Sequence, residues 1–200
     1  MGKKKPAGWS SIDLDFTEEM AGYIPKLAKL ENDIGAGLSG GRYFPHSSLE
    51  GGEDTIGFGH KIGADPSIDK DYDFSKGLSE DQAMELLTRD TLEAYRRAFN
   101  AYKKEYSVGE WNKLSNKAKV ALTDISFNTG NIEDYKAAFK SGNVEDIKSA
   151  IRERGYSAEG VESKLGVRNE AIIRDYIDPD DWSEESSRMR EWIREDNLLA

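Results

Sequence analysis

The sequence predicts an α+β fold in which a small N-terminal β lobe is joined by a long helix to a mainly helical C-terminal lobe. Three observations lead to this class. Glycines, prolines and short aromatic or β-branched runs fill residues 41–76, as is typical of strands and turns. Residues 79–104 carry apolar side chains at helical spacing. Helical periodicity then returns after residue 115 and continues towards the C-terminus.

The first predicted helix starts at Pro25, because proline suits the first turn of a helix. Leu27, Leu30, Glu31 and Ile34 follow at the spacing i, i+3, i+4 and i+7. This spacing places Glu31 on or beside the apolar stripe, near the end of the helix. The glycines of "GAGLSGG" then break the pattern.

The long helix, 79 to about 104, opens with Ser79 and Gln82 as a capping box. Its apolar positions are Leu86, Leu87, Ala94, Tyr95, Ala98 and Phe99. A buried helix is predicted in "SNKAKVALTDISFNTG", with Gly130 as its stop. Shorter helices are expected at about 131–140, 143–153 and 165–176, and an amphipathic one at 182–197.

The predicted domain organisation has three parts. Residues 1–22 form an N-terminal arm that is partly ordered at best, residues 23–177 form the main domain, and residues 178–200 form a C-terminal helical extension. The N-terminus lacks the apolar run of a signal peptide, and no stretch approaches the ~18 apolar residues of a membrane span. We therefore expect synthesis in the cytoplasm without a signal peptide, and no stable membrane insertion.

Charge and composition disfavour several kinds of partner. The chain has 28 basic and 38 acidic side chains, a net charge of -10, which repels nucleic acid. It has no cysteine, which excludes disulfides, thiolate nucleophiles and Cys-ligated metals. It has only two histidines, His46 and His60, which leaves little for a His-based metal site. We expect neither a metal nor another cofactor.

The stretch "EGGEDTIGFGH", residues 50–60, is dense in glycine and allows several interpretations. It is neither a phosphate-binding loop nor a dinucleotide fingerprint, because its glycines run into a strand-like alternation instead of a helix. It could be a hairpin in which Thr55, Ile56 and Phe58 only pack. It could also be one wall of a catalytic cleft.

Glu31 favours the catalytic interpretation of this stretch. A carboxylate on an apolar stripe is desolvated, which raises its pKa and favours the protonated form that a general acid needs. Cleavage of a glycosidic bond requires such an acid and a second polar group that handles water. The alternative for Glu31 is a salt bridge to a buried arginine.

Several motifs resemble one family in the right order. "TIGFGHKI" resembles the T-I-G-Y-G-H signature of phage-type (T4-like) lysozymes, glycoside hydrolase family 24. "GLSEDQAMELLTRD" is similar to the start of the family's interlobe helix, and "SNKAKVALTDISFNTGN" to its buried helix. "GVRNEAIIRDY" resembles its arginine-containing stretch. The resemblance covers about 24–177 and implies a lysozyme-like catalytic domain.

The resemblance implies roles for individual residues. Glu31 matches the proton donor, Thr55 the threonine that helps to hold the attacking water, and His60 a structural histidine paired with a carboxylate. Substrate-binding positions are Phe127 and Asn128, which line the sugar groove, and Arg168, near the acid. Each of these three has a plain alternative: a core aromatic, the end of a helix and an ion-pair partner, respectively.

The sequence departs from the family pattern at the second carboxylate. Leu49 stands where the family has an aspartate, six residues before the threonine. Glu50 is the nearest carboxylate and our candidate for the base that positions water, whereas Glu53 and Asp54 abut the strand. The segment from Glu31 to Thr55 is also longer than in the T4 protein, which leaves the aromatic side chains of residues 43 and 44 available to stack on sugar.

The function expected from the resemblance is that of a peptidoglycan muramidase. It hydrolyses the β-1,4 bond between N-acetylmuramic acid and N-acetylglucosamine, with inversion. A lytic transglycosylase that uses Glu31 alone, and an inactive wall-binding or virion structural module, remain open alternatives. We expect a monomer whose partner is peptidoglycan and which reaches the wall through a holin-type lesion or as part of a virion.

Overall fold

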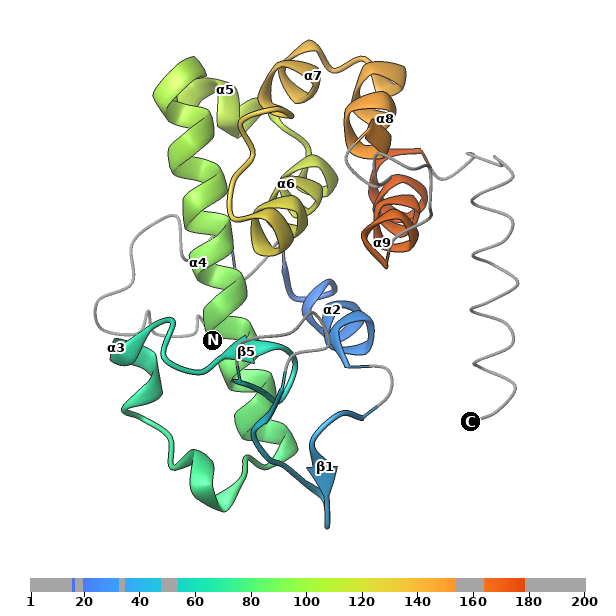
Figure 1. Cartoon of the computed structure of the whole chain (residues 1–200). Coiled ribbons are helices and arrows are strands. Elements are labelled where there is room, and N and C mark those ends of the chain that lie inside the picture. The colour runs from blue at the N-terminus through green and yellow to red at the C-terminus, as the bar shows by residue number, and fades with distance from the viewer. Residues whose placement is uncertain (1–15, 17–19, 33–34, 48–53, 154–163, 179–200) are drawn as a thin grey trace, which may run out of the picture. The chain divides into compact units, whose positions relative to one another are not determined.

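The computed structural model describes residues 16, 20–32, 35–47, 54–153 and 164–178. The chain divides into two compact units, Met1–Ala94 and Tyr95–Ala200. The long helix α4, Glu80–Tyr106, begins in the first unit and ends in the second, as Figure 1 shows in green. Small antiparallel strands lie in the first unit and helices make up the described part of the second. The predicted α+β class is thus confirmed.

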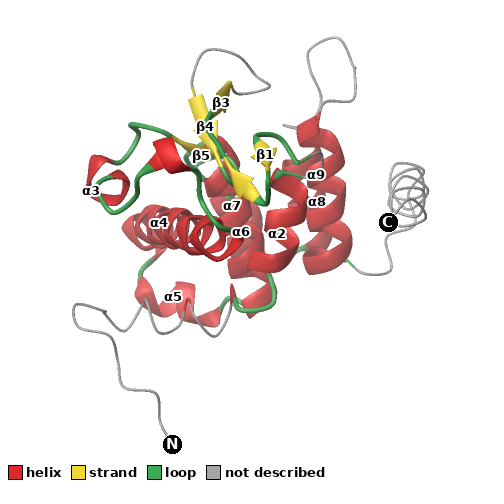
Figure 2. Ribbon diagram, turned by 90° about the horizontal axis from the view of Figure 1, so that it is seen from below, coloured by secondary structure: helices red, strands yellow, loops and turns green. Residues whose placement is uncertain are grey.

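The first unit combines helices with short antiparallel strands. Strands β1 (Leu38–Ser39) and β2 (Arg42–Tyr43) form a two-stranded sheet. Strands β3 (His46–Ser47), β4 (Asp54–Ile56) and β5 (His60–Lys61) form a three-stranded sheet in that order (Figure 2). The short helix α3 (Pro66–Asp69) and a 3-10 turn, η1 (Phe74–Lys76), lead into α4.

Helix α2, Ile24–Glu31, forms where the sequence predicts it, with its proline in the first turn. Its buried side chains are Leu27 and Ala28, and Glu31 is its last residue. Phe16 and Met20, which fall in the predicted N-terminal arm, are buried as well. The intervals in the series Phe16, Met20, Tyr23 and Leu27 are four, three and four residues. This helical spacing continues the apolar face of α2 towards the N-terminus.

Helix α4 confirms the predicted capping box. The backbone N–H of Ser79 donates to Oε1 of Gln82 at 2.9 Å, and the N–H of Gln82 donates to Oγ of Ser79 at 3.2 Å. Five of the six predicted apolar positions are buried, and the sixth, Phe99, is half-buried. Phe99 packs edge-on against Trp111, with ring centroids 5.6 Å apart.

The second unit contains the predicted buried helix, α6 (Asn116–Thr129). Ser115 caps its start, accepting from the N–H of Ala118 at 3.1 Å, and Gly130 ends it in the left-handed conformation, with φ of 77°. The other elements of this unit are α5 (Val108–Lys113), α7 (Lys136–Ser141), α8 (Val144–Glu153), α9 (Lys164–Ile172) and a π-helical turn, η2 (Ile173–Ile177).

Two differences from the prediction occur in the second unit. Helix α5 is not predicted, because a six-residue helix is too short to show an apolar period. Helix α7 begins at Lys136 and not near residue 131, because the side chain of Asn131 accepts from the N–H of Glu133 at 3.1 Å and holds a turn there. The helix predicted at 182–197 lies outside the described residues.

The predicted domain boundaries at residues 22 and 177 remain predictions. Within the part of the chain that the structure describes, no helix combines the length and the apolar character needed to cross a membrane.

Candidate active site

Glu31 lies at the end of α2, where the hairpin turn between β4 and β5 approaches its carboxyl group. Its side chain is half-buried. Gly59, in that turn, has φ of 86°, and a Cβ atom placed on it would lie 3.1 Å from Oε2 of Glu31. Such a distance is tighter than ordinary van der Waals contact. The glycine thus provides both the turn conformation and the space that the carboxyl group occupies.

Asn32, the residue after Glu31, ties the end of α2 to the same turn. Its Nδ2 donates to the carbonyl oxygen of Gly57 at 2.9 Å and to that of Ala36 at 3.1 Å. Its Oδ1 accepts from the N–H of Ala36 at 2.6 Å. Asn32 is not among the residues predicted from the sequence to form the site. The signal available was an asparagine directly after a helix and before a glycine-rich loop, where its side chain often bonds to the backbone.

Thr55 lies in the middle of β4, on the hairpin whose turn contacts Glu31. It is 7% exposed and is paired with His46 of β3 and Lys61 of β5. Its Oγ1 is 3.3 Å from Nε2 of His46. The first unit therefore holds the predicted acid and the predicted water-holding hydroxyl on a helix end and a hairpin that contact one another.

His60, in β5, is buried between two carboxylates. Its Nε2 lies 2.7 Å from Asp69 and its Nδ1 lies 2.9 Å from Asp90. Burial alone would lower the pKa of His60, but hydrogen bonds and charge interactions with Asp90 and Asp69 outweigh it, so the pKa is raised above 6.5. The contacts join β5 to α3 and α4 within the first unit, as the predicted structural role requires.

The three predicted substrate-binding residues lie in the second unit, where Asn128 and Arg168 contact Asp124 of α6 and Phe127 contacts Arg168. Arg168, from α9, is buried and donates from Nη2 to Oδ1 of Asp124 at 2.6 Å and from Nε at 3.0 Å. Asn128 donates to the carbonyl oxygen of Asp124 at 2.8 Å and to Oδ2 at 3.2 Å. The guanidinium carbon of Arg168 lies over the ring of Phe127, 5.8 Å from the ring centroid.

This cluster shows what the sequence analysis missed. Asp124 was not singled out, although an aspartate on the apolar face of a buried helix is itself a signal for a buried partner. Arg168 forms an ion pair, which is the alternative to sugar binding that the sequence allows for it. Asn128 is exposed and lies near the end of α6. Their sugar-binding roles remain predictions.

The other predicted positions of the first unit have contacts of their own or lie outside the described residues. Tyr43 packs against Phe58, with ring centroids 5.2 Å apart, and both Tyr43 and Phe44 are half-buried. Asp54 is exposed and paired with Ser47 across the sheet. Glu50, the candidate base, lies outside the described residues together with Leu49.

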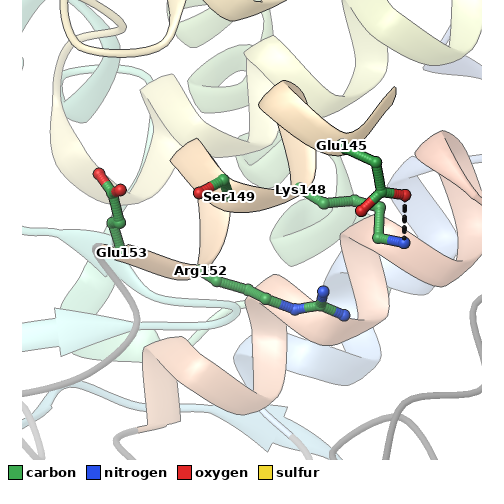
Figure 3. Close-up of a pocket in the computed structure, with 5 residues that line it drawn as sticks. All are labelled: Glu145, Lys148, Ser149, Arg152 and Glu153. Carbon is green, nitrogen blue, oxygen red and sulfur yellow. Dashed lines mark hydrogen bonds and ion pairs between the residues drawn. The ribbon is translucent and has the colours of Figure 1, made fainter. Parts of the chain in front are cut away.

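A hollow of about 420 Å³ in the second unit carries none of these residues. It is lined by charged and small polar side chains of α8: Glu145, Lys148, Ser149, Arg152 and Glu153 (Figure 3). Lys148 is paired with Glu145 at 3.0 Å, and Arg152 donates to Glu170 at 2.8 Å. Its cations are thus already engaged by carboxylates. Among the described residues, no group of side chains could hold a metal ion.

An α+β chain in which a glycine-rich hairpin approaches a helix-terminal glutamate has the organisation of a lysozyme-like fold. The family model for phage lysozyme matches residues 39–164, and the chain belongs to this family. The resemblance found in the sequence is thereby confirmed. A search of curated proteins finds no match.

Membership of this family implies a glycosidase that acts on peptidoglycan in the cell wall. The matched span contains Thr55, His60, Phe127 and Asn128. Glu31 and Arg168 lie just outside it, so their assignments rest on the sequence motifs and on the contacts described above.

Proposed function

We propose that the chain is a muramidase that hydrolyses the β-1,4 bond between N-acetylmuramic acid and N-acetylglucosamine. Glu31 is the general acid, Thr55 holds the attacking water, and Glu50 is the base. The observation that supports this most is the approach of the Gly59 turn to the carboxyl group of Glu31. A carboxyl group fixed against a backbone turn keeps one position, and general acid catalysis depends on such placement.

The chemical steps follow from the two sides of the bond. The Glu31 carboxyl gives its proton to the glycosidic oxygen as the bond from that oxygen to the anomeric carbon breaks. The water oxygen bonds to the same carbon from the opposite face, and Glu50 takes the water proton. The products are a free reducing end and a free hydroxyl, with inverted configuration at the anomeric carbon.

Substrate binding is assigned to the second unit in this proposal. Phe127 offers a half-buried ring and Asn128 an exposed amide, both from the end of α6. Arg168 supports these residues through Asp124. We further propose that the protein acts as a monomer and reaches the wall through a holin-type lesion or as part of a virion.

A lytic transglycosylase is the second candidate, and Leu49 is the observation that favours it. With leucine where the family has its aspartate, water could be left without a base. A single glutamate would then protonate the leaving oxygen and accept the proton of a muramic hydroxyl, which closes an anhydro ring.

Product analysis separates the two reactions. Purified peptidoglycan is digested in water enriched in oxygen-18, and the released muropeptides are analysed by mass spectrometry with and without borohydride reduction. The proposal expects reducing muramic ends that carry the heavy isotope and are shifted by reduction. Anhydro-muramic ends without the isotope would contradict it and support the transglycosylase.

A further inference from the structure

His46 makes the one contact that the structure gives to the Thr55 hydroxyl from another side chain among the described residues. The two residues are direct partners in the antiparallel pair β3–β4, so their side chains lie on the same face of the sheet. Oγ1 of Thr55 is 3.3 Å from Nε2 of His46 and can also donate to the carbonyl oxygen of His46 at 3.4 Å, so the ring nitrogen is the nearer of two acceptors for the hydroxyl hydrogen.

The imidazole ring of His46 is also held on its other side. Its Nδ1 lies 3.2 Å from the carbonyl oxygen of Phe44. Gly37, with φ of 72°, passes so close that a Cβ atom on it would lie 2.5 Å from Nδ1. The N–H of Phe44 donates to the carbonyl oxygen of Gly37 at 2.9 Å, which fixes this backbone beside the ring. The ring is therefore held between two backbone segments and Thr55.

These partners favour one position for the proton of a neutral His46. A carbonyl oxygen only accepts, so Nδ1 carries the hydrogen that it donates to Phe44. The lone pair then lies on Nε2, which is a nearer acceptor for the hydroxyl hydrogen of Thr55 than the carbonyl oxygen of His46. With that hydrogen engaged, the lone pairs of Oγ1 can accept a hydrogen from water. A water held in this way keeps its own lone pair for attack on carbon.

We propose that His46 is a positioning residue for the hydrolytic water, because its Nε2 takes the hydroxyl hydrogen of Thr55 and so leaves the lone pairs of the threonine oxygen in a fixed direction to accept from water. This inference rests on the proposed function, in which Thr55 holds the water. It adds a residue to which no role was assigned above. It also gives the hairpin a fixed acceptor at a site where leucine occupies the place of the family aspartate.

The tautomer of His46 gives a test that does not depend on activity. The chain has two histidines, so a long-range nitrogen-15 spectrum of the imidazole rings is readily assigned with a His60→Asn variant as reference. In the neutral form of the ring, we expect His46 with its proton on Nδ1. In Thr55→Val, the Nε2 resonance should shift. A proton on Nε2 in the wild type would overturn the proposal.

A double-mutant cycle tests the link to catalysis on soluble, uncross-linked glycan strands. Asparagine can replace the contact of Nδ1 with Phe44 but cannot reach Thr55, whereas glutamine reaches the position of Nε2. We expect His46→Asn to lower kcat roughly 10- to 100-fold with little change in KM, since misorientation of a reacting group acts on the rate. His46→Gln should recover most of that loss.

The cycle is completed in the Thr55→Val background. There, His46→Asn should cause no further loss, because residues that act as a unit are not additive. Equal losses in both backgrounds, or an unchanged kcat in His46→Asn, would overturn the proposal. Circular dichroism and thermal unfolding verify that each variant is folded at the assay temperature. Glu31→Gln is measured in parallel to distinguish a failure of the role proposed for His46 from a failure of the proposed function. An active Glu31→Gln protein contradicts the proposed function itself.

Discussion

The Nδ2 atom of Asn32 donates a hydrogen bond to the carbonyl oxygen of Gly57 at 2.9 Å, so the residue next to Glu31 is fixed to the turn of the β4–β5 hairpin. Asn32 also accepts from the N–H of Ala36 at 2.6 Å through Oδ1. One side chain therefore holds the end of α2, the following loop and the hairpin together. We expect the placement of Glu31 relative to the hairpin to depend on this contact.

An Asn32→Asp variant keeps the hydrogen bond that this side chain accepts and removes the two that it donates, to the carbonyl oxygens of Gly57 and Ala36. Aspartate can still accept from Ala36, but it faces the Gly57 carbonyl with an oxygen in place of a donor. We expect kcat to fall roughly tenfold or more, since a small displacement of the proposed acid slows the reaction. The free energy of unfolding should change by about 1–2 kcal/mol. Steady-state kinetics and urea unfolding measure the two effects. A kcat equal to that of the wild type would show that this contact does not position Glu31.

Gly59→Ala tests whether the hairpin turn positions the Glu31 carboxyl. The new methyl group would lie 3.1 Å from Oε2 and would also require a strained backbone at φ of 86°. Gly63→Ala is a matched control, because Gly63 has φ of 89° and no atom within 4 Å of the added Cβ.

Both alanine variants should lose about 1–2 kcal/mol of unfolding free energy from the left-handed backbone. Only Gly59→Ala should also lose activity, by roughly tenfold or more, because the acid must move. Rate measurements at a temperature where both proteins are folded make the comparison. Equal activities of the two variants would indicate that the approach of Gly59 to Glu31 has no catalytic consequence.

The pairing of His60 with Asp69 and Asp90 predicts a pH-dependent contribution to stability. Because the pKa of His60 is raised in the folded state above the unfolded value of 6.5, its contribution is fully present below about pH 6.5. It is lost as the pH rises through the folded pKa. We expect His60→Asn to be destabilised by about 3 kcal/mol at about pH 5.5, and by less at about pH 8.5.

Urea unfolding of the wild type and His60→Asn at these two pH values measures the difference. Asp90→Asn is the companion variant: it removes one carboxylate, so the pH-dependent loss should begin at a lower pH. A destabilisation by His60→Asn that is the same at both pH values would contradict the ion-pair interpretation.

Much of the first unit could be predicted because its signals are local. The Ser79–Gln82 capping box and the proline of α2 act within one helical turn, so their meaning can be seen in a few residues. The partners of His60 could not be named, since Asp69 and Asp90 lie nine and thirty residues further along the chain. From the sequence, we could expect only that His60 is paired with a carboxylate.

The candidate site shows the same contrast between local sequence signals, which can be predicted, and contacts between distant residues, which cannot. Glu31 is predicted to be the acid because a carboxylate interrupts an apolar stripe and because its motif resembles the family's, and this role stays a prediction. Asn32 and His46 were missed, since an asparagine after a helix and a histidine near a proline are also ordinary loop residues. Their roles depend on which backbone carbonyl each side chain reaches, and this is decided when the hairpin folds against α2.

Arg168 has a predicted role and an observed contact that lead to different outcomes on substitution. Asp124 accepts from Nη2 at 2.6 Å in a buried position, so Asp124→Asn should destabilise the protein by about 3–5 kcal/mol because it leaves the guanidinium poorly compensated. Thermal and urea unfolding check this value. A role in sugar binding further predicts that Arg168→Lys raises KM, whereas a purely structural role changes stability alone.

The central claim is that Glu31 is the general acid, and the turnover of Glu31→Gln on purified peptidoglycan tests it most directly. Glutamine keeps the shape of the side chain but has no acidic proton to give. The account predicts a folded protein, by circular dichroism and thermal unfolding, whose rate is lower by at least roughly 10²–10⁴-fold. A folded Glu31→Gln protein that solubilises peptidoglycan at a rate close to that of the wild type would contradict it.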